Sequence, residues 1–138
     1  MKQVFVDTSA LIALGNTRDA FHRAACQVNN ELRQQHCYFV TTAAVLLEFA
    51  NAFSSLRLRQ TAITLIEAMR TSERWTCVNL DEELFQKAFD RFKIVRDKEW
   101  GLVDCLSIIV AEESGIREIF STDHHFEQAG FTILLRPQ

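Results

Sequence analysis

The sequence is poor in proline and glycine, with one proline and four glycines in 138 residues. It contains no linker, low-complexity tract or internal repeat. Hydrophobic residues make up 48% of the chain and charged residues 24%, which excludes a disordered protein. We therefore predict a single domain, residues 1–138, with enough apolar side chains for its own core.

The cysteines of the chain form no recognisable motif. None of the four cysteines lies in a C-x-x-C pair or at a metal-like spacing from a histidine. They are Cys26, Cys37, Cys77 and Cys105. We expect reduced thiols that pack as small apolar groups in a cytoplasmic protein. Asp7 interrupts the N-terminal apolar run, so we expect no export signal. Residues 38–56 are too polar for a membrane span, so no membrane partner is expected.

The chain also lacks a surplus of positive charge. It has 18 acidic and 15 basic residues and a formal net charge of −3. This balance does not by itself indicate a nucleic-acid-binding protein. Bound cations would change it, because two divalent ions add four charges and bring −3 to +1.

What the sequence does contain is a regular alternation of short apolar runs and helical patterns. The runs predict strands at residues 4–6, 37–40, 75–80, 116–120 and 131–135. The helical patterns cover residues 10–14, 16–36, 43–53, 56–69, 82–95, 100–111 and 124–130. This alternation predicts an α/β domain with a five-stranded, mostly parallel sheet sandwiched between helices.

The helical spacing also predicts caps and buried faces. Thr41 or Thr42 is expected to cap the helix at 43–53, and Asp81 the helix at 82–95. The inward positions expected in the helix at 16–36 are Ala20, Phe21, Ala24, Val28 and Leu32. Those expected in the helix at 82–95 are Leu84, Phe85, Ala88, Phe89 and Phe92, and those in the helix at 56–69 are Leu58, Ile63, Leu65, Ile66 and Met69.

Four acids stand out because three of them are lone charges in apolar stretches. Asp7 follows the first strand and Asp123 follows the fourth. Asp104 is the only charge in the apolar helix at 100–111, and Glu48 is the only charge between residues 37 and 56. Each has a simpler interpretation. Asp7 could be a helix N-cap, and Glu48 could lie on the wet side of a half-buried helix.

If these acids meet at one end of the sheet, their repulsion raises their pKa values and costs stability. Hard divalent cations relieve that repulsion, because Mg²⁺ and Mn²⁺ prefer carboxylate and water oxygens. A carboxylate cluster that holds one or two such ions is suited to phosphodiester hydrolysis by activated water.

The chain resembles PIN-domain proteins, in particular the VapC-type ribonuclease toxins of prokaryotic toxin–antitoxin pairs. The matching motifs are Val-Asp-Thr-Ser-Ala at 6–10, Leu-Glu-Phe-Ala-Asn at 47–51, Val-Asp-Cys-Leu-Ser at 103–107, Ser-Thr-Asp-His-His-Phe at 121–126, and the closing segment 126–134. The resemblance implies a Mg²⁺- or Mn²⁺-dependent endoribonuclease. Its catalytic and metal-binding acids would be Asp7, Glu48, Asp104 and Asp123, supported by Ser9 and Thr122.

The resemblance also implies partners. RNA would be the substrate, a cognate antitoxin the inhibitor that blocks the acidic groove, and a second copy of the chain a dimer partner. The candidate RNA contacts are Arg18, Arg23, Arg57, Arg59, Arg96 and Lys98. Trp100 could stack on a base or pack against the helix that carries Asp104. The Leu- and Ile-rich segment 56–66 is a further surface for a partner.

Two residues depart from the family pattern. Gly101 stands where similar proteins often carry Ser or Thr, so a helix cap is lost. His125 stands where many relatives have a further acid, which leaves one-metal and two-metal chemistry both open.

Among other functions, a receiver domain would need an acidic pair after the first strand, and a haloacid-dehalogenase-type phosphatase would need an acid where Ser9 stands. The stronger alternative is a non-catalytic or DNA-directed PIN domain, a binding module stabilised by metal.

Overall fold

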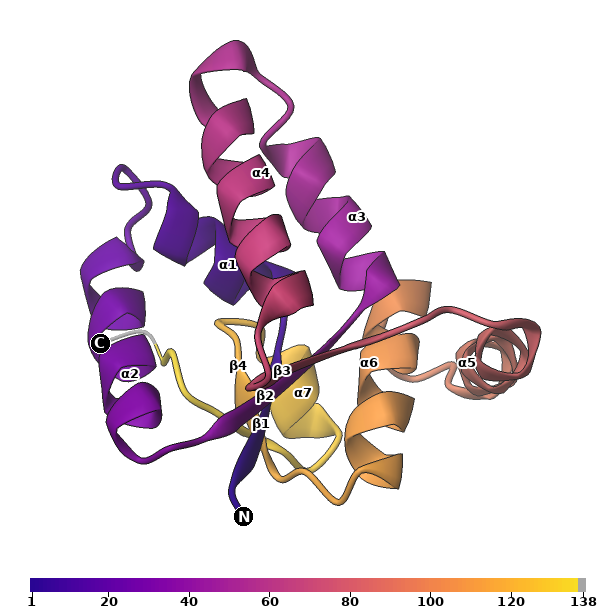
Figure 1. The fold of residues 1–138 in the computed structure, drawn as a ribbon. Coiled ribbons are helices and arrows are strands. Elements are labelled where there is room, and N and C mark those ends of the chain that lie inside the picture. The colour runs from indigo at the N-terminus through magenta and orange to yellow at the C-terminus, as the bar shows by residue number, and fades with distance from the viewer. Residues whose placement is uncertain (137–138) are drawn as a thin grey trace.

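Five strands and seven helices alternate along residues 1–136, the part of the chain that this computed structural model describes (Figure 1). The strands are β1 (Gln3–Val6), β2 (Tyr38–Thr42), β3 (Trp75–Val78), β4 (Glu118–Phe120) and β5 (Thr132–Ile133). The helices are α1 (Thr8–Gly15), α2 (His22–Gln34), α3 (Ala43–Ala52), α4 (Leu56–Thr71), α5 (Glu82–Ile94), α6 (Leu102–Glu113) and α7 (His125–Gln128). The last two residues of the predicted domain lie outside the described part.

The strands form one sheet in the order β3-β2-β1-β4-β5, and every pairing is parallel. The predicted α/β class and five-stranded sheet are thus confirmed. The chain builds outward from β1 to β3, then returns to the other side of β1 to form β4 and β5. Because parallel crossovers are right-handed, helices from the two halves cover opposite faces. Figure 1 shows α1, α2 and α4 on one side of the sheet and α5, α6 and α7 on the other.

This topology determines where a ligand can bind. The strand order reverses between β1 and β4, which pair through Phe5 with Ile119 and Val6 with Phe120. In open parallel sheets, a crevice forms outside the carboxyl ends of the strands at this switch point. Asp7 directly follows β1 and Asp123 follows β4, so both acids lie at the crevice.

The core lies around the central strand and the most apolar helix. Val4, Phe5 and Val6 are fully buried, as expected of a strand covered on both faces. Every residue of α6 from 105 to 111 is buried. Asp104 therefore lies on a helix that is held in place by the packing of the buried residues that follow it.

The start of α2 differs from the expectation. Residues 16–21 form turns instead of the first helical turns, and α2 begins at His22. The Asn16 side-chain oxygen accepts from the Arg18 backbone N–H at 3.0 Å, and the Asp19 carboxylate accepts from the Phe21 N–H at 2.8 Å. Such local side-chain bonds compete with the helix. Ala20, expected inside, is exposed.

The buried face of α5 is also narrower than expected. Leu84 and Ala88 are buried, whereas Phe85, Phe89 and Phe92 are 38–43% exposed. The reason is that α5 packs chiefly against α6, and one helix neighbour covers only a narrow stripe. On α4, Ile63 is likewise exposed, although Met69 is buried as expected.

Smaller details follow the sequence more closely. Thr42 accepts a hydrogen bond from the Val45 N–H, and Asp81 accepts one from the Leu84 N–H, so both predicted caps are confirmed. The four cysteines are free thiols. No helix within residues 1–136 combines the length and apolar character that crossing a bilayer requires.

Candidate active site

Asp7 stands at the junction of β1 and α1, and it is 7% exposed. It occupies the N-cap position of α1, but its side chain makes no capping hydrogen bond. Its Oδ2 atom instead accepts from the hydroxyls of Ser121 at 2.9 Å and Ser9 at 3.1 Å. Since the side chain is held by residues outside the cap, the plain N-cap interpretation does not account for it.

The two serines belong to a network that joins the ends of β1 and β4. Ser9 Oγ lies 3.1 Å from Ser121 Oγ and accepts from the Thr122 backbone N–H at 3.1 Å. Ser121 Oγ also accepts from the Asp123 N–H at 2.9 Å. The Ser9 hydroxyl therefore lies between Asp7 and the backbone N–H of Thr122. Sequence reasoning passed over Ser121, although its hydroxyl directly after a strand was a signal.

Asp104 and Asp123 meet at the side chain of His125. Nδ1 of His125 lies 3.4 Å from Oδ2 of Asp104 and 3.1 Å from Oδ1 of Asp123. One ligand atom from each of the three residues lies within 4.8 Å of the other two. The Gly101 N–H donates to Asp104 Oδ2 at 3.0 Å, so this glycine orients the acid through its backbone.

Burial and nearby negative charge raise the pKa values of Asp7 and Asp104. Burial is the main reason that the pKa of Asp7 rises from 3.8 to about 6, and the charge of Asp104 adds to it, against the serine hydrogen bonds. The pKa of Asp104 is also raised, chiefly by burial and further by Asp123, while the Gly101 N–H and His125 act to lower it. A divalent cation would relieve this cost.

Glu48 lies on the wet side of α3, as the simpler of its two interpretations predicted. It is exposed, whereas Val45 and Phe49 form the buried face of the helix. Its Oε1 atom accepts from the Thr8 hydroxyl at 2.7 Å. Thr8 is the residue after Asp7, so its hydroxyl links Glu48 to the segment that carries Asp7. Sequence reasoning did not identify Thr8 as this link.

The basic candidates lie on separate segments of the chain. Arg96 and Lys98 lie in the segment that leads into the N-terminus of α6, close in the chain to Asp104. Lys98 pairs with Asp97 at 3.0 Å and lies 5.7 Å from the ring centroid of Trp100. Trp100 is half-buried and packs on the core. The exposed Arg18 and Arg57 lie on other segments, next to α1 and in α4.

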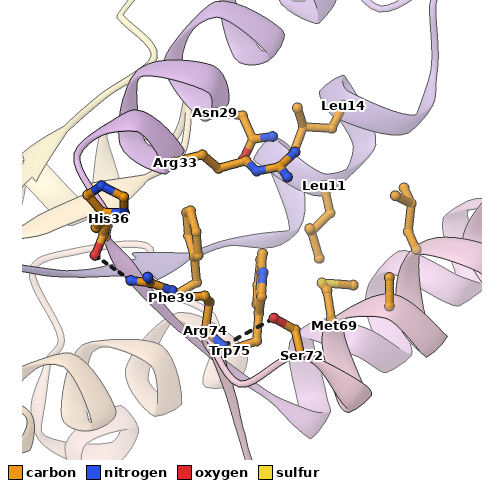
Figure 2. A pocket seen from close by; sticks show the side chains of 13 residues that line it. Leu11, Leu14, Asn29, Arg33, His36, Phe39, Met69, Ser72, Arg74 and Trp75 are labelled. Carbon is orange, nitrogen blue, oxygen red and sulfur yellow. Dashed lines mark hydrogen bonds between the residues drawn. The ribbon is translucent and has the colours of Figure 1, made fainter.

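A cavity of about 460 Å³ lies apart from the acids, between α1, α2 and α4. The rings of Phe39 and Trp75 line it (Figure 2). They are stacked, with their centroids 4.8 Å apart. Arg74 is held there by the His36 carbonyl, to which it donates at 2.9 Å. None of the four predicted acids lines this cavity, so it is a feature separate from the carboxylate cluster.

The residues present fit a hard divalent cation. Asp104, Asp123 and His125 converge, and Asp7 adds a buried carboxylate whose pKa is raised in part by the charge of Asp104. Oxygen donors predominate, which suits Mg²⁺ and Mn²⁺. Such a site can activate water and offset the charge of a phosphodiester.

Comparison with known proteins gives a consistent result. Residues 4–132 match the family model described as PIN domain. The chain is 28% identical over 135 residues to the "23S rRNA-specific endonuclease VapC20" of two Mycobacterium tuberculosis strains, across 98% of this chain and 99% of the relative.

Solved structures agree. The crystal structure of M. tuberculosis VapC20, described as a sarcin-ricin loop cleaving toxin, superposes with a TM-score of 0.81 at 27% identity, over 97% of this chain and 99% of that one. VapBC2 from Rickettsia felis, bound to a promoter DNA fragment, superposes with a TM-score of 0.66 at 12% identity over 95% and 96% of the two chains. The second likeness concerns the fold alone.

Proposed function

The chain belongs to the PIN domain family, and from this premise we propose that it is a metal-dependent endoribonuclease, the toxin of a toxin–antitoxin pair. The observation that carries the proposal is the convergence of Asp104, Asp123 and His125 beside the buried Asp7, at the switch point of the sheet. The similarity to VapC20, named an RNA endonuclease, supports RNA as the substrate.

The proposed cofactor is Mg²⁺ or Mn²⁺, held by Asp7, Asp104 and Asp123, with Glu48 at the edge of the site. When bound, such an ion supplies Lewis acidity, because it lowers the pKa of water and offsets phosphate charge. The protein's own residues supply orientation. Ser9 and Ser121 hold Asp7, the Gly101 N–H holds Asp104, and Thr8 holds Glu48. Fixed carboxylates cost no reorganisation when the reaction occurs.

Substrate contact is proposed for Arg96, Lys98 and Trp100, because their segment leads into the helix that carries Asp104. Arginine and lysine attract phosphates, and an aromatic ring can stack on a base. Arg18 and Arg57, which are exposed on other segments of the chain, are proposed as further contacts with RNA. Because VapC20 is described as cleaving the sarcin-ricin loop, ribosomal RNA is the first substrate to test.

The test is cleavage of a mixed RNA pool and of purified ribosomal RNA by the full chain. Reactions contain Mn²⁺, Mg²⁺ or a chelator. The Asp104→Asn variant should fold normally and lose at least about a hundredfold in rate, because a carboxylate that contacts the metal is gone. The matched control is Glu67→Gln, which removes one exposed acid from α4 and should cut normally.

The result also decides the alternative. Cutting of single-stranded or duplex DNA, but not RNA, would show a DNA-directed PIN domain. Metal that raises the melting temperature without any turnover would show a non-catalytic, metal-stabilised module. Undiminished RNA cleavage by Asp104→Asn would refute the assignment of the site.

We further propose two protein partners in a cytoplasmic setting. An antitoxin is supported by the description of VapC20 as a toxin. The surface of this chain that contacts the antitoxin is proposed to include α4, where Leu56 is 90% and Ile63 is 41% exposed. A second copy of the chain could cover the exposed phenylalanines of α5. Sedimentation of the purified chain, alone and co-expressed with its cognate antitoxin, measures both assemblies.

A further inference from the structure

His125 is the feature of the site that the family pattern does not explain. Its side chain is 23% exposed, and it begins α7 directly beside two carboxylates. Its Nδ1 atom is buried and, among the described residues, makes no hydrogen bond. This is so although oxygens of Asp123 and Asp104 lie only 3.1 and 3.4 Å away. The nitrogen is close to both oxygens, but it is not aligned to donate a proton to either.

A nitrogen so placed suits a metal ligand. In an octahedral site with bonds of about 2.1 Å, neighbouring ligand atoms lie about 3 Å apart. The spacings from Nδ1 to Asp123 Oδ1 and to Asp104 Oδ2 are near that value. Nδ1 therefore has the spacing of an adjacent corner to each of the two carboxylate oxygens, and all three donor atoms lie within 4.8 Å of one another. Their lone pairs would be satisfied by the ion rather than by one another.

Local structure fixes the imidazole in this position. The His125 backbone N–H donates to Asp123 Oδ1 at 2.9 Å, so the residue is tied to one of the acids it faces. The next residue, Phe126, is fully buried and anchors α7 to the core. A ligand on a rigid element loses little conformational freedom when the ion binds.

We infer that His125 binds the catalytic ion through Nδ1 and gives this site a preference for Mn²⁺ over Mg²⁺. The inference rests on the proposed metal-dependent function and deepens it. Imidazole nitrogen is a good ligand for transition ions, whereas Mg²⁺ favours oxygen and keeps its waters. An acid at this position would bind both ions with similar affinity. The nitrogen donor is the reason that the site is expected to bind Mn²⁺ more tightly than Mg²⁺.

The experiment measures ion binding to the full chain in the absence of RNA. Dissociation constants for Mn²⁺ and Mg²⁺ are determined by calorimetry for the wild type, His125→Ala and His125→Asp. The matched control is His124→Ala, because the adjacent His124 ring is 71% exposed and lies 3.9 Å from Asp123. Circular dichroism establishes that each variant is folded.

The wild type is expected to bind Mn²⁺ at least about tenfold more tightly than Mg²⁺. His125→Ala should weaken Mn²⁺ binding about tenfold or more and Mg²⁺ binding less than about threefold. His125→Asp should bind both ions with similar affinity. His124→Ala should match the wild type. If His125→Ala does not fold, His125→Asp still carries the comparison.

A spectroscopic signature completes the test. Electron spin echo modulation of bound Mn²⁺ should show coupling to a ¹⁴N nucleus in the wild type and in His124→Ala, but not in His125→Ala. Absence of nitrogen coupling in the wild type, equal loss of both ions in His125→Ala, or no Mn²⁺ binding would overturn the inference.

RNA cleavage is scored separately. A protein that cuts RNA without this selectivity refutes only the role of His125, and one that binds Mn²⁺ selectively but cuts nothing refutes only the proposed activity.

Discussion

Replacing Asp7 by asparagine should make the metal-free protein more stable at neutral pH. The pKa of Asp7 is about 6 in the folded chain, against 3.8 as the ordinary value, mainly because the group is buried. As the pH rises through this interval, the unfolded chain releases its proton first. The folded state then holds the proton more tightly, so the free energy of unfolding falls with rising pH.

The magnitude follows from the two pKa values. At about 1.4 kcal/mol per pH unit, the separation between 3.8 and about 6 corresponds to about 3 kcal/mol above pH 7. Asparagine carries no charge and has nearly the same shape. Its side-chain oxygen can accept the bonds from Ser9 and Ser121 that Oδ2 accepts now. We therefore expect Asp7→Asn to gain about 1–3 kcal/mol over the wild type at pH 7.5, and almost nothing at pH 4.

The assay is urea unfolding of both proteins with a chelator at pH 4, 5, 6 and 7.5. The difference between the two proteins at each pH isolates Asp7 from the other titrating groups. Added Mn²⁺ should then restore stability to the wild type by mass action but help Asp7→Asn little. A difference that does not grow with pH, or a variant less stable than the wild type at pH 7.5 in chelator, would refute the reasoning.

Two further substitutions test contacts seen only in the structure. Thr8→Val removes the hydroxyl that donates to Glu48 and should slow RNA cleavage about threefold to tenfold, with unfolding unchanged, because the pair is exposed. An unchanged rate would show that Glu48 needs no such support. Gly15→Ala places a Cβ atom 2.6 Å from Cε2 of the buried Phe53, so it should cost about 1–3 kcal/mol in urea unfolding. Stability within about 0.5 kcal/mol of the wild type would mean that the Phe53 ring moves aside freely.

Helix faces were harder to predict than the helices themselves. The spacing of Phe85, Phe89 and Phe92 is that of an inward stripe, yet these rings are partly exposed. The pattern shows which residues share a helix face, but not how many neighbours cover that face. Only α6 covers much of α5, so the stripe through Leu84 and Ala88 is the buried one.

The same limit applies to Glu48. A lone charge in an apolar run is compatible with a site acid and with a residue on the wet side of a half-buried helix, and only the structure shows that α3 exposes Glu48. The run is apolar because one face of α3 packs on the core, while its other face reaches solvent. Leu47, the residue beside Glu48, is 64% exposed for the same reason. What ties Glu48 to the site is the Thr8 hydroxyl, a contact across 40 residues of sequence.

The sequence by itself determined the class of the fold and singled out the candidate acids. Alternating apolar runs and helical patterns define a parallel α/β sheet, because only that arrangement buries strands on both faces. An acid directly after a buried strand, as Asp7 is after β1, must then lie where the carboxyl ends of the parallel strands meet. These conclusions need only local periodicity and chain direction.

Only the tertiary structure decided which groups meet. The reversal of strand order places β4 beside β1, so that Ser121 reaches Asp7 across 114 residues of chain. It also brings α6 and α7 together, so that Asp104 meets His125. Such distances depend on how helices pack on the two faces, which no pattern within a single segment contains. A histidine at position 125 looks ordinary in the sequence and becomes a metal-ligand candidate only when two carboxylates close around it.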